Sequence, residues 1–394
     1  MLLILQIIIG CFIGFIFGLI PNFHINIISY IFLELSLIFI FPNYFYLFLS
    51  LSISQLITSY IPTTIFGVPN TENIMFLFPA QRLFSKGKAK QAIFLSLFGS
   101  FFGVIFSILL LPLLYILFLI LGKYSLFIYL VIIFVLILFI FQEKEFKQKL
   151  VVFSIIIISG TLGIFTLKLN YFFKSPLLVC VSGLFAFPML IKSLFDKPSY
   201  VLQETKTESI PKNNIFLTFF GALSALLIIL VPSFSSSQAA TVVSKIKSNL
   251  CSSKYLILFS SISISSLIFS YFLAINFLKP RLGYIAVLLL EHQIPIHINY
   301  LLFSLVILIS TTFSVLLIYL IIDYIIYFVN THNLNFLNLI VLIISLVIVL
   351  LVSGFKSIFL LVLSILIGFL PINFNKSRVI LMAYIMIPTL LFYI

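Results

Sequence analysis

Two polar clusters, each following a proline, interrupt long apolar stretches of this sequence. The first follows Pro21 and contains Asn22, His24 and Asn26. The second follows Pro232 and contains Ser233, Ser235, Ser236, Ser237 and Gln238. A proline breaks helical hydrogen bonding, and the helix that resumes after it presents free N–H groups and a partial positive charge. Hydroxyl and amide side chains beside two such helix ends predict a binding site for a small anion. The alternative is that both prolines mark ordinary surface turns with capping residues behind them.

A third cluster runs from residue 61 to residue 73 and contains two prolines, one glycine and several polar side chains. We expect the prolines and the glycine to exclude a regular helix and to produce a re-entrant hairpin. Four side chains of this cluster offer hydroxyl or amide groups that can hold a carboxylate. They are Thr63, Thr64, Asn70 and Asn73. The alternative is a polar surface loop that precedes the basic stretch 82–90.

Three carboxylates are candidates for binding a proton or a cation, namely Glu72, Glu34 and Asp323. Glu72 lies among the amides of the third cluster, where it could carry a proton or coordinate a cation. Glu34 and Asp323 lie within apolar runs, where an ionisable residue is a functional candidate by default. Of the three carboxylates, we expect Glu72 rather than Glu34 or Asp323 to bind the ion. Interhelical hydrogen bonding or snorkelling is the alternative for Glu34 and Asp323.

No arrangement of residues indicates catalysis, a cofactor or a metal centre. The nearest approach to a zinc-protease motif is Glu291-His292 followed by His297, which has the wrong order and spacing. The three cysteines lie far apart, so they predict neither a disulfide framework nor a metal cluster. No nucleophile elbow or phosphate-binding loop occurs either. We therefore expect that the protein is not an enzyme.

These clusters must be positioned by a chain that is too apolar for a water-soluble fold. Of its 394 residues, 63% are hydrophobic and 8% are charged, and the mean hydropathy is +1.34. Soluble domains have about 25% charged residues. Six runs lack any charged residue: 92–122, 124–142, 150–167, 213–244, 255–278 and 298–322. They do not alternate as barrel strands would, so we expect an all-α polytopic membrane protein with roughly ten to twelve transmembrane helices.

The net charge of +13 does not indicate a nucleic-acid partner, because the basic residues sit at the ends of apolar runs. A charged linker, 196–213, which we expect to be exposed, divides the chain into two transmembrane halves, 1–195 and 214–394. Shifting the second half by 211 positions aligns Gly221 with Gly10 and Pro232 with Pro21. The same shift aligns 260–271 with 49–60, with eight of twelve residues identical. This pattern predicts two repeats, against the alternative of chance matching in a biased sequence.

The distribution of basic residues predicts that the two repeats are inverted. The stretch 82–90 is rich in Lys and Arg, as cytoplasmic loops are, whereas its counterpart 292–301 contains neither. Lys279 and Arg281 do not fit this scheme. Broken helices at corresponding positions of inverted repeats are typical of the binding site in secondary transporters. We therefore expect a multi-pass transporter of the cytoplasmic membrane that moves a small organic anion together with H⁺ or Na⁺. The alternative is a non-transporting membrane scaffold or a lipid-handling protein.

The sequence also resembles the large permease subunit of the tripartite tricarboxylate transporters (TctA-like), in particular its divergent archaeal branch. In the first half, the motifs that carry this resemblance are Gly14-x3-Gly18-x2-Pro21 with His24 and Asn26, and the 65–69 stretch Ile-Phe-Gly-Val-Pro, which is followed by Glu72, Pro79 and the 86–92 stretch. In the second half, they are Pro232 with 236–240, Gly368-x2-Pro371, and the set Arg378, Met382 and Pro388. Two positions depart from the family, because Asn22 and Ser233 stand where a glycine usually follows each proline.

The resemblance implies a permease for small organic anions in which the segments after the two prolines and the Gly-x-Pro hairpin form the substrate pathway. It also implies two partners of the family, a small membrane subunit and an extracytoplasmic binding protein. The lipid bilayer is the remaining partner that we expect, and the sequence is compatible with a homodimer.

Overall fold

A computed structural model describes residues 2–20, 25, 44–67, 76–121, 125–141, 143–168, 175–195, 201–207, 214–230, 236, 239–240, 243, 250–290, 293–295, 299–332 and 334–393. The regular structure of these residues is helical, and they include no strand. Eight helices among them are long and apolar enough to cross a membrane. The predicted all-α polytopic fold class is therefore confirmed.

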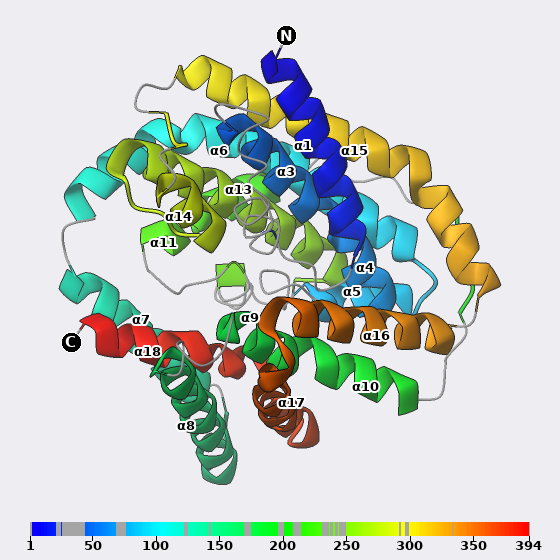
Figure 1. The fold of residues 1–394 in the computed structure, drawn as a ribbon, viewed down its shortest axis with the longest axis vertical. Coiled ribbons are helices and arrows are strands. Elements are labelled where there is room, and N and C mark those ends of the chain that lie inside the picture. The colour runs from blue at the N-terminus through cyan, green and yellow to red at the C-terminus, as the bar shows by residue number, and fades with distance from the viewer. Residues whose placement is uncertain are drawn as a thin grey trace.

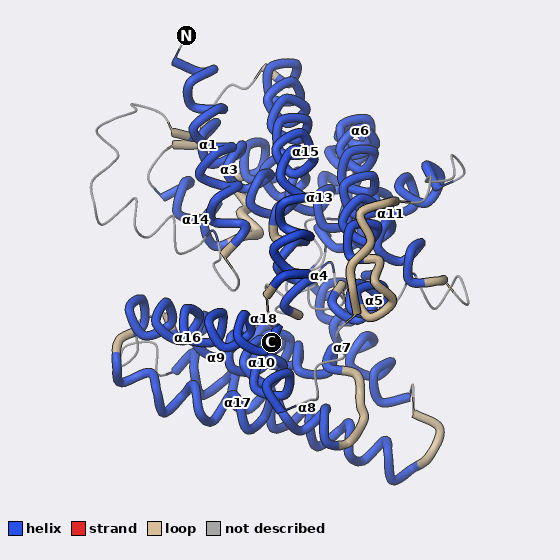
Figure 2. Tube along the Cα trace, turned by 90° about the vertical axis from the view of Figure 1, so that its right-hand side faces the viewer, coloured by secondary structure: helices blue, strands red, loops and turns tan. Residues whose placement is uncertain are grey.

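The helices form two groups that lie one above the other in Figures 1 and 2. The upper group consists of α1 (Leu2–Leu19), α3 (Phe45–Thr58), α4 (Tyr60–Phe66), α5 (Leu77–Phe84), α6 (Ala89–Leu121), α11 (Ile215–Leu230), α13 (Ser252–Phe277), α14 (Gly283–Leu290) and α15 (Tyr300–Thr331). The lower group consists of α7 (Ser125–Phe141), α8 (Phe146–Lys168), α9 (Pro176–Val181), the π-helix η2 (Ser182–Ala186), α10 (Phe187–Phe195), α16 (Leu334–Ser353), the short 3₁₀ helix η4 (Phe355–Ser357), α17 (Ile358–Asn373), the 3₁₀ helix η5 (Arg378–Met382) and α18 (Ala383–Tyr393).

Each group has its own apolar core. Phe45, Ile257 and Ile307 belong to the upper core, and Leu184 and Leu361 belong to the lower one. Both cores contain helices from the first and the second half of the chain. The two halves, 1–195 and 214–394, therefore both contribute residues to each core.

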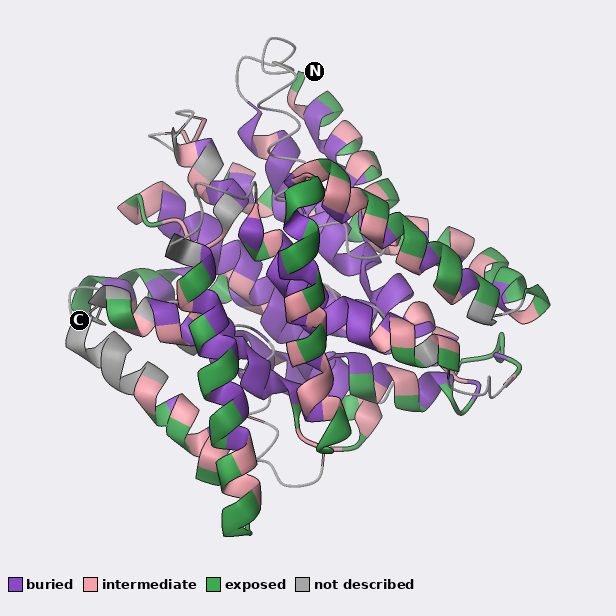
Figure 3. Cartoon of the chain, turned by 60° about the horizontal axis from the view of Figure 1, so that its bottom comes forward, coloured by how far each residue is buried: buried purple, intermediate pink, exposed green. Residues whose placement is uncertain are grey.

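The helices α13 and α3–α4 lie at the centre of the upper group, where buried residues dominate (Figure 3). In each of these two spans, 94% of the most apolar window is buried, against at most 44% in the other six. They also carry the matching serine-rich motifs of the two halves. Several of their serine hydroxyls donate to carbonyls of their own helix, as Ser50 Oγ does to Leu47 O at 2.9 Å and Ser260 Oγ does to Leu256 O at 2.8 Å. These bonds satisfy polar groups in apolar surroundings.

Glycines let neighbouring helices approach the two central helices closely. A Cβ on Gly10 of α1 would lie 2.5 Å from Leu47 O of α3. At the positions related by the shift of 211, a Cβ on Gly221 of α11 would lie 3.0 Å from Leu258 O of α13. Serines add bonds between the helices, since Ser54 Oγ donates to Cys11 O at 2.8 Å. The glycines of α1 therefore allow close helix packing.

The helix bounds follow the same shift along the chain. The ends of α1 and α11, of α4 and α13, and the starts of α6 and α15 are each 211 positions apart. The two long helices α6 and α15 run antiparallel, because Lys90 near the start of α6 pairs with Asp323 and Phe94 contacts Tyr319, four residues earlier on α15. These correspondences fit a duplication with inversion, which stays a prediction.

The lower group shows a reciprocal exchange between the halves. A Cβ on Gly163 of α8 would collide with Tyr384 O and lie 2.8 Å from Pro388 of α18. A Cβ on Gly368 of α17 would lie 2.6 Å from Leu184 O and 2.7 Å from Pro188. In each case a glycine of one half meets a carbonyl and a proline, four residues apart, of the other half. The exchange holds the lower group together across the two halves.

The expectation that residues 61–73 exclude a regular helix was wrong for the first part of that cluster. Pro62 lies in the first turn of α4, where an N–H would have no helical acceptor and its loss costs little. The helix ends at Gly67, whose φ of 68° is left-handed, as a glycine after a helix allows. Residues 68–75 lie outside the described residues, so the re-entrant hairpin stays a prediction.

The composition of the charged linker 196–213 predicted that it is exposed, but part of it is buried. Gln203 is 4% exposed, and its side chain accepts a bond from Ala89 N at the start of α6, at 3.1 Å. Its backbone exchanges bonds with Asn330 near the end of α15, at 2.9 and 3.0 Å. The first N–H groups of a helix need acceptors from outside the helix, and the linker supplies one here. It thereby ties α6 to α15.

Substitution Gly99→Ala tests the glycine packing. The methyl group would collide with Ser260 Oγ and with the backbone carbonyl of Ile257 on α13. We expect a loss of about 1–3 kcal/mol of stability, because the backbone must move to relieve the overlap. Thermal unfolding of the purified protein in detergent measures this loss. The control is Leu109→Ala, which removes a 68% exposed side chain of the same helix and should change little. Equal unfolding temperatures for Gly99→Ala and the parent protein would contradict the packing role.

Candidate functional site

The structure describes four of the residues that the sequence predicts to bind substrate or ions. They are Thr63, Thr64, Ser236 and Asp323. The others lie outside the described residues: Asn22, His24, Asn26, Glu34, Asn70, Glu72, Asn73, Ser233, Ser235, Ser237 and Gln238. Their proposed roles therefore stay predictions.

Thr63 and Thr64 are fully buried in α4. Thr63 Oγ1 donates to Ser59 O at 2.8 Å, and Thr64 Oγ1 donates to Tyr60 O at 2.7 Å. Each hydroxyl has one proton, and the helix uses it. In this conformation the two side chains can accept a hydrogen bond but have no proton to give to an anion.

The end of α4 lies at the boundary between the two helix groups. Gln81 Nε2 of α5 donates to Thr64 O at 2.7 Å, which holds α5 against α4. Phe66 packs against the upper core and also against a small cluster formed by Ala186, Leu190 and Val341 of the lower group. The third polar cluster of the sequence therefore begins where the two groups meet.

The described residues of the two Pro-centred segments lie in the upper core. In the second segment, Ala239 and Ala240 belong to this core, and Ser236, which precedes them by three and four positions, is 5% exposed. This spacing places all three on one helical face. In the first segment, Ile25 is 3% exposed and belongs to the same core. Both segments thus contribute to the interior of the same helix group.

Asp323 lies on an exposed face near the end of α15. Its side chain is 60% exposed and pairs with Lys90 Nζ at 2.5 Å. The sequence placed Asp323 within an apolar run, and the structure places it in the last third of α15, which has 32 residues, whereas about 20 suffice to cross a bilayer. The side chain of its partner Lys90 is 13% exposed, and a pair that is open to solvent at its carboxylate contributes about 0–1 kcal/mol. A surface ion pair accounts for Asp323 better than a buried coupling site does.

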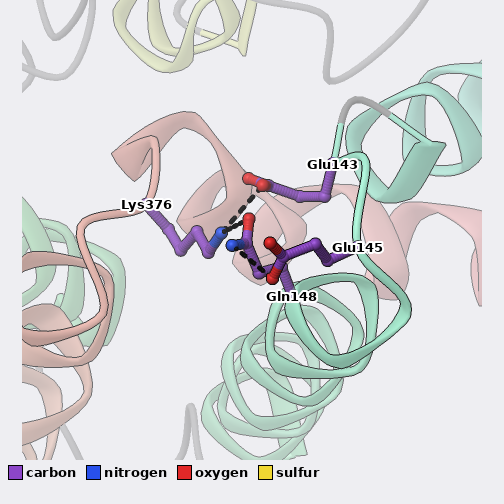
Figure 4. Close-up of polar contacts among 4 residues, drawn as sticks. All are labelled: Glu143, Glu145, Gln148 and Lys376. Atoms are coloured by element: carbon purple, nitrogen blue, oxygen red, sulfur yellow. Dashed lines mark hydrogen bonds and ion pairs between the residues drawn. The ribbon is translucent and has the colours of Figure 1, made fainter.

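The other described carboxylates with resolved partners lie at the start of α8. Lys376 Nζ pairs with Glu143 Oε2 at 2.8 Å and donates to Gln148 Oε1 at 2.9 Å, and Gln148 Nε2 donates to Glu145 at 2.9 Å (Figure 4). This network joins the segment after α17 to the connection between α7 and α8. Among the described residues, no three His, Cys, Asp or Glu side chains lie close enough to hold a metal ion.

Arg378, which the sequence analysis did not assign to the site, lies at the same boundary between the groups. It begins η5 and is 2% exposed. Its Nη1 donates to Phe185 O of the π-helix at 3.4 Å, and its guanidinium lies 6.0 Å from the ring centre of Phe78 on α5. Burying a charge costs several kcal/mol, whereas a cation–π contact returns about 0.5–2 kcal/mol. The signal in the sequence was a single arginine within an apolar C-terminal segment.

Comparison with known proteins places the chain in a transporter family. It is 30% identical over 327 residues to an uncharacterised protein of Methanocaldococcus jannaschii, and the match covers 81% of this chain and 79% of that relative. No solved structure matches the chain. Residues 4–383 match the family described as "Tripartite tricarboxylate transporter TctA family". With its apolar helices and this match over nearly its whole length, the chain is a multi-pass membrane protein that belongs to the TctA family, a family of transporters rather than enzymes.

Proposed function

We propose that this chain is the permease of a secondary transporter that carries a small organic anion of the carboxylate type across the cytoplasmic membrane. The observation that carries the proposal is the shared core of the two Pro-centred segments, to which Ile25 and Ala240 both belong. Helix ends with small polar side chains, converging on one interior, would form a cradle for a negative charge. The family membership supports transport of such an anion.

The arrangement of the helices supports a mechanism with alternating access. The two central helices α3 and α13 meet across the halves, where Ser52 Oγ lies 3.2 Å from Tyr271 OH. The upper and lower groups are joined by the connections from α6 to α7 and from α15 to α16, which correspond under the shift of 211. Inverted repeats of this kind allow one group to move against the other around a fixed site. The site would then open to each side of the membrane in turn.

Ion coupling and partners complete the proposal. Glu72 is the first choice for coupling to H⁺ or Na⁺, since Asp323 is already paired with Lys90. The tripartite family supports a small membrane subunit and an extracytoplasmic binding protein as partners. Asn22 and Ser233 replace the usual glycines beside the two prolines, so we propose an organic anion in general rather than a tricarboxylate in particular.

Uptake of labelled citrate and succinate into proteoliposomes tests the anion cradle. Ser236→Ala and Asn26→Ala should each lower uptake roughly tenfold or more, because a lost hydrogen bond to a charged ligand costs about 1.5–3 kcal/mol. The matched control is Ser154→Ala, since Ser154 is exposed on α8 and bonds only within its helix in the described contacts. Unchanged uptake in both site variants would contradict the proposal that the two Pro-centred segments bind the anion. No uptake of any carboxylate by the parent protein would favour a scaffold or lipid-handling role.

The same assay tests the choice of coupling residue. Asp323→Asn should keep both the uptake rate and its dependence on an H⁺ or Na⁺ gradient, because it removes only an exposed ion pair. Glu72→Gln should abolish the gradient dependence. If uptake by Asp323→Asn no longer depended on the ion gradient while uptake by Glu72→Gln still did, Asp323 rather than Glu72 would be the coupling residue.

Cysteine labelling tests the orientation of the two halves in the membrane. In a background with the exposed Cys251 replaced by serine, Ser85→Cys and Thr331→Cys should react with an impermeant thiol reagent from the cytoplasmic side. Tyr300→Cys, at the opposite end of α15, should react from the other side. All three positions are exposed. Labelling of Tyr300→Cys and Thr331→Cys from the same side would contradict a membrane-spanning α15.

A further inference from the structure

Arg378 carries a positive charge that the described part of the protein does not neutralise. Its Nη2 atom is buried and has no hydrogen-bond partner. Its Nη1 atom reaches Phe185 O only at the long distance of 3.4 Å. A buried guanidinium is usually paired with a carboxylate or a phosphate, because it can donate to two oxygens at once. Within the part of the chain that the structure describes, one donor able to bind an anion is therefore unused.

The neighbouring Lys376 belongs to the same segment, and its positive charge is neutralised by a partner within the chain. Two residues before Arg378, it pairs with Glu143 at 2.8 Å and bonds to Gln148 (Figure 4). The described carboxylates with resolved contacts are engaged elsewhere, Glu143 with Lys376, Glu145 with Gln148 and Asp323 with Lys90. Among the described residues, Lys376 therefore has carboxylate and amide partners, whereas Arg378 has no carboxylate partner and could accept an anion from outside the chain.

The surroundings of Arg378 belong to both helix groups. Phe185 lies in the π-helix of the lower group, and Phe78 lies on α5 of the upper group. π-Helical turns are rare and occur frequently at functional sites. The helix α5 is held to α4 through the bond from Gln81 to Thr64 O. An anion bound to Arg378 would therefore contact the boundary across which the two groups move.

We infer that Arg378 is the counter-charge for a carboxylate of the transported anion. This inference rests on the proposed function, since it assigns a further residue to the same transport path. The guanidinium donates through Nη2 to a carboxylate oxygen, while Phe78 covers one side of the charge. Because Phe78 and Arg378 belong to different groups, the affinity of the site depends on how the groups are placed.

Ligand-induced thermal stabilisation of the full-length protein in nanodiscs tests this inference, with citrate and succinate as probes and inorganic phosphate for comparison. Arg378→Met should bind the carboxylates roughly tenfold more weakly or worse, since a charge-assisted bond is lost. Without ligand, it should unfold at or above the temperature of the parent protein, because removing an unpaired buried charge does not destabilise the fold. Arg378→Lys should retain part of the affinity. Stabilisation of the parent by phosphate alone would identify a phosphate site and overturn the carboxylate assignment.

Lys376→Met is the matched control, because it removes a cation that has its own partner. It should lower the unfolding temperature without ligand and keep the carboxylate-induced shift. If Arg378→Met is destabilised in the same way, the chain itself supplies a partner for Arg378 and the inference is wrong. If Arg378→Met keeps the full shift, the inference is wrong but the proposed function stands. If the parent protein neither binds nor transports any carboxylate, both fail together.

Discussion

The fold depends on the close approach of helices across glycine. In lipid the hydrophobic effect does not drive helices together, so packing contacts and hydrogen bonds between small residues must do so. Gly10 lies against Leu47 O and Gly221 against Leu258 O, at equivalent positions of the two halves. Serine hydroxyls at these contacts bond to nearby carbonyls, as in Ser261 to Thr218 O at 2.6 Å. This packing lets α3 and α13 occupy the interior although they are rich in serine.

The two halves of the chain are interlocked rather than placed side by side. The upper core takes α3 from one half and α13 from the other, and the lower core takes α8 and α17 in the same way. The glycine contacts of Gly163 and Gly368 run in opposite directions between the halves. A single half would leave both cores incomplete. The boundary between the groups lies at the end of α4 and at η5, where Phe66 and Arg378 contact residues of the other group.

Polar residues in this fold serve different purposes, and their contacts separate them. Thr63, Thr64 and several serines of the central helices give their protons to backbone carbonyls and so belong to the packing. Lys90 and Lys376 are neutralised by carboxylates. Arg378 is buried without such a partner among the described residues. Only the last kind of group leaves a strong interaction open to a ligand, because the cost of its burial is not offset within the described fold.

The sequence by itself determined the helical membrane class and the family, because composition, apolar run length and short motifs can be read along the chain. It also gave the shift of 211 that the helix bounds follow. It misjudged Pro62, because a proline is harmless in a first helical turn, and Gln203, because composition does not show which backbone groups need an acceptor. Only the tertiary structure decided that Asp323 is a surface ion pair and that Arg378 is buried at the boundary between the groups. Both outcomes depend on which distant segments pack around the charged side chain. The neighbours of that residue in the sequence do not determine this packing.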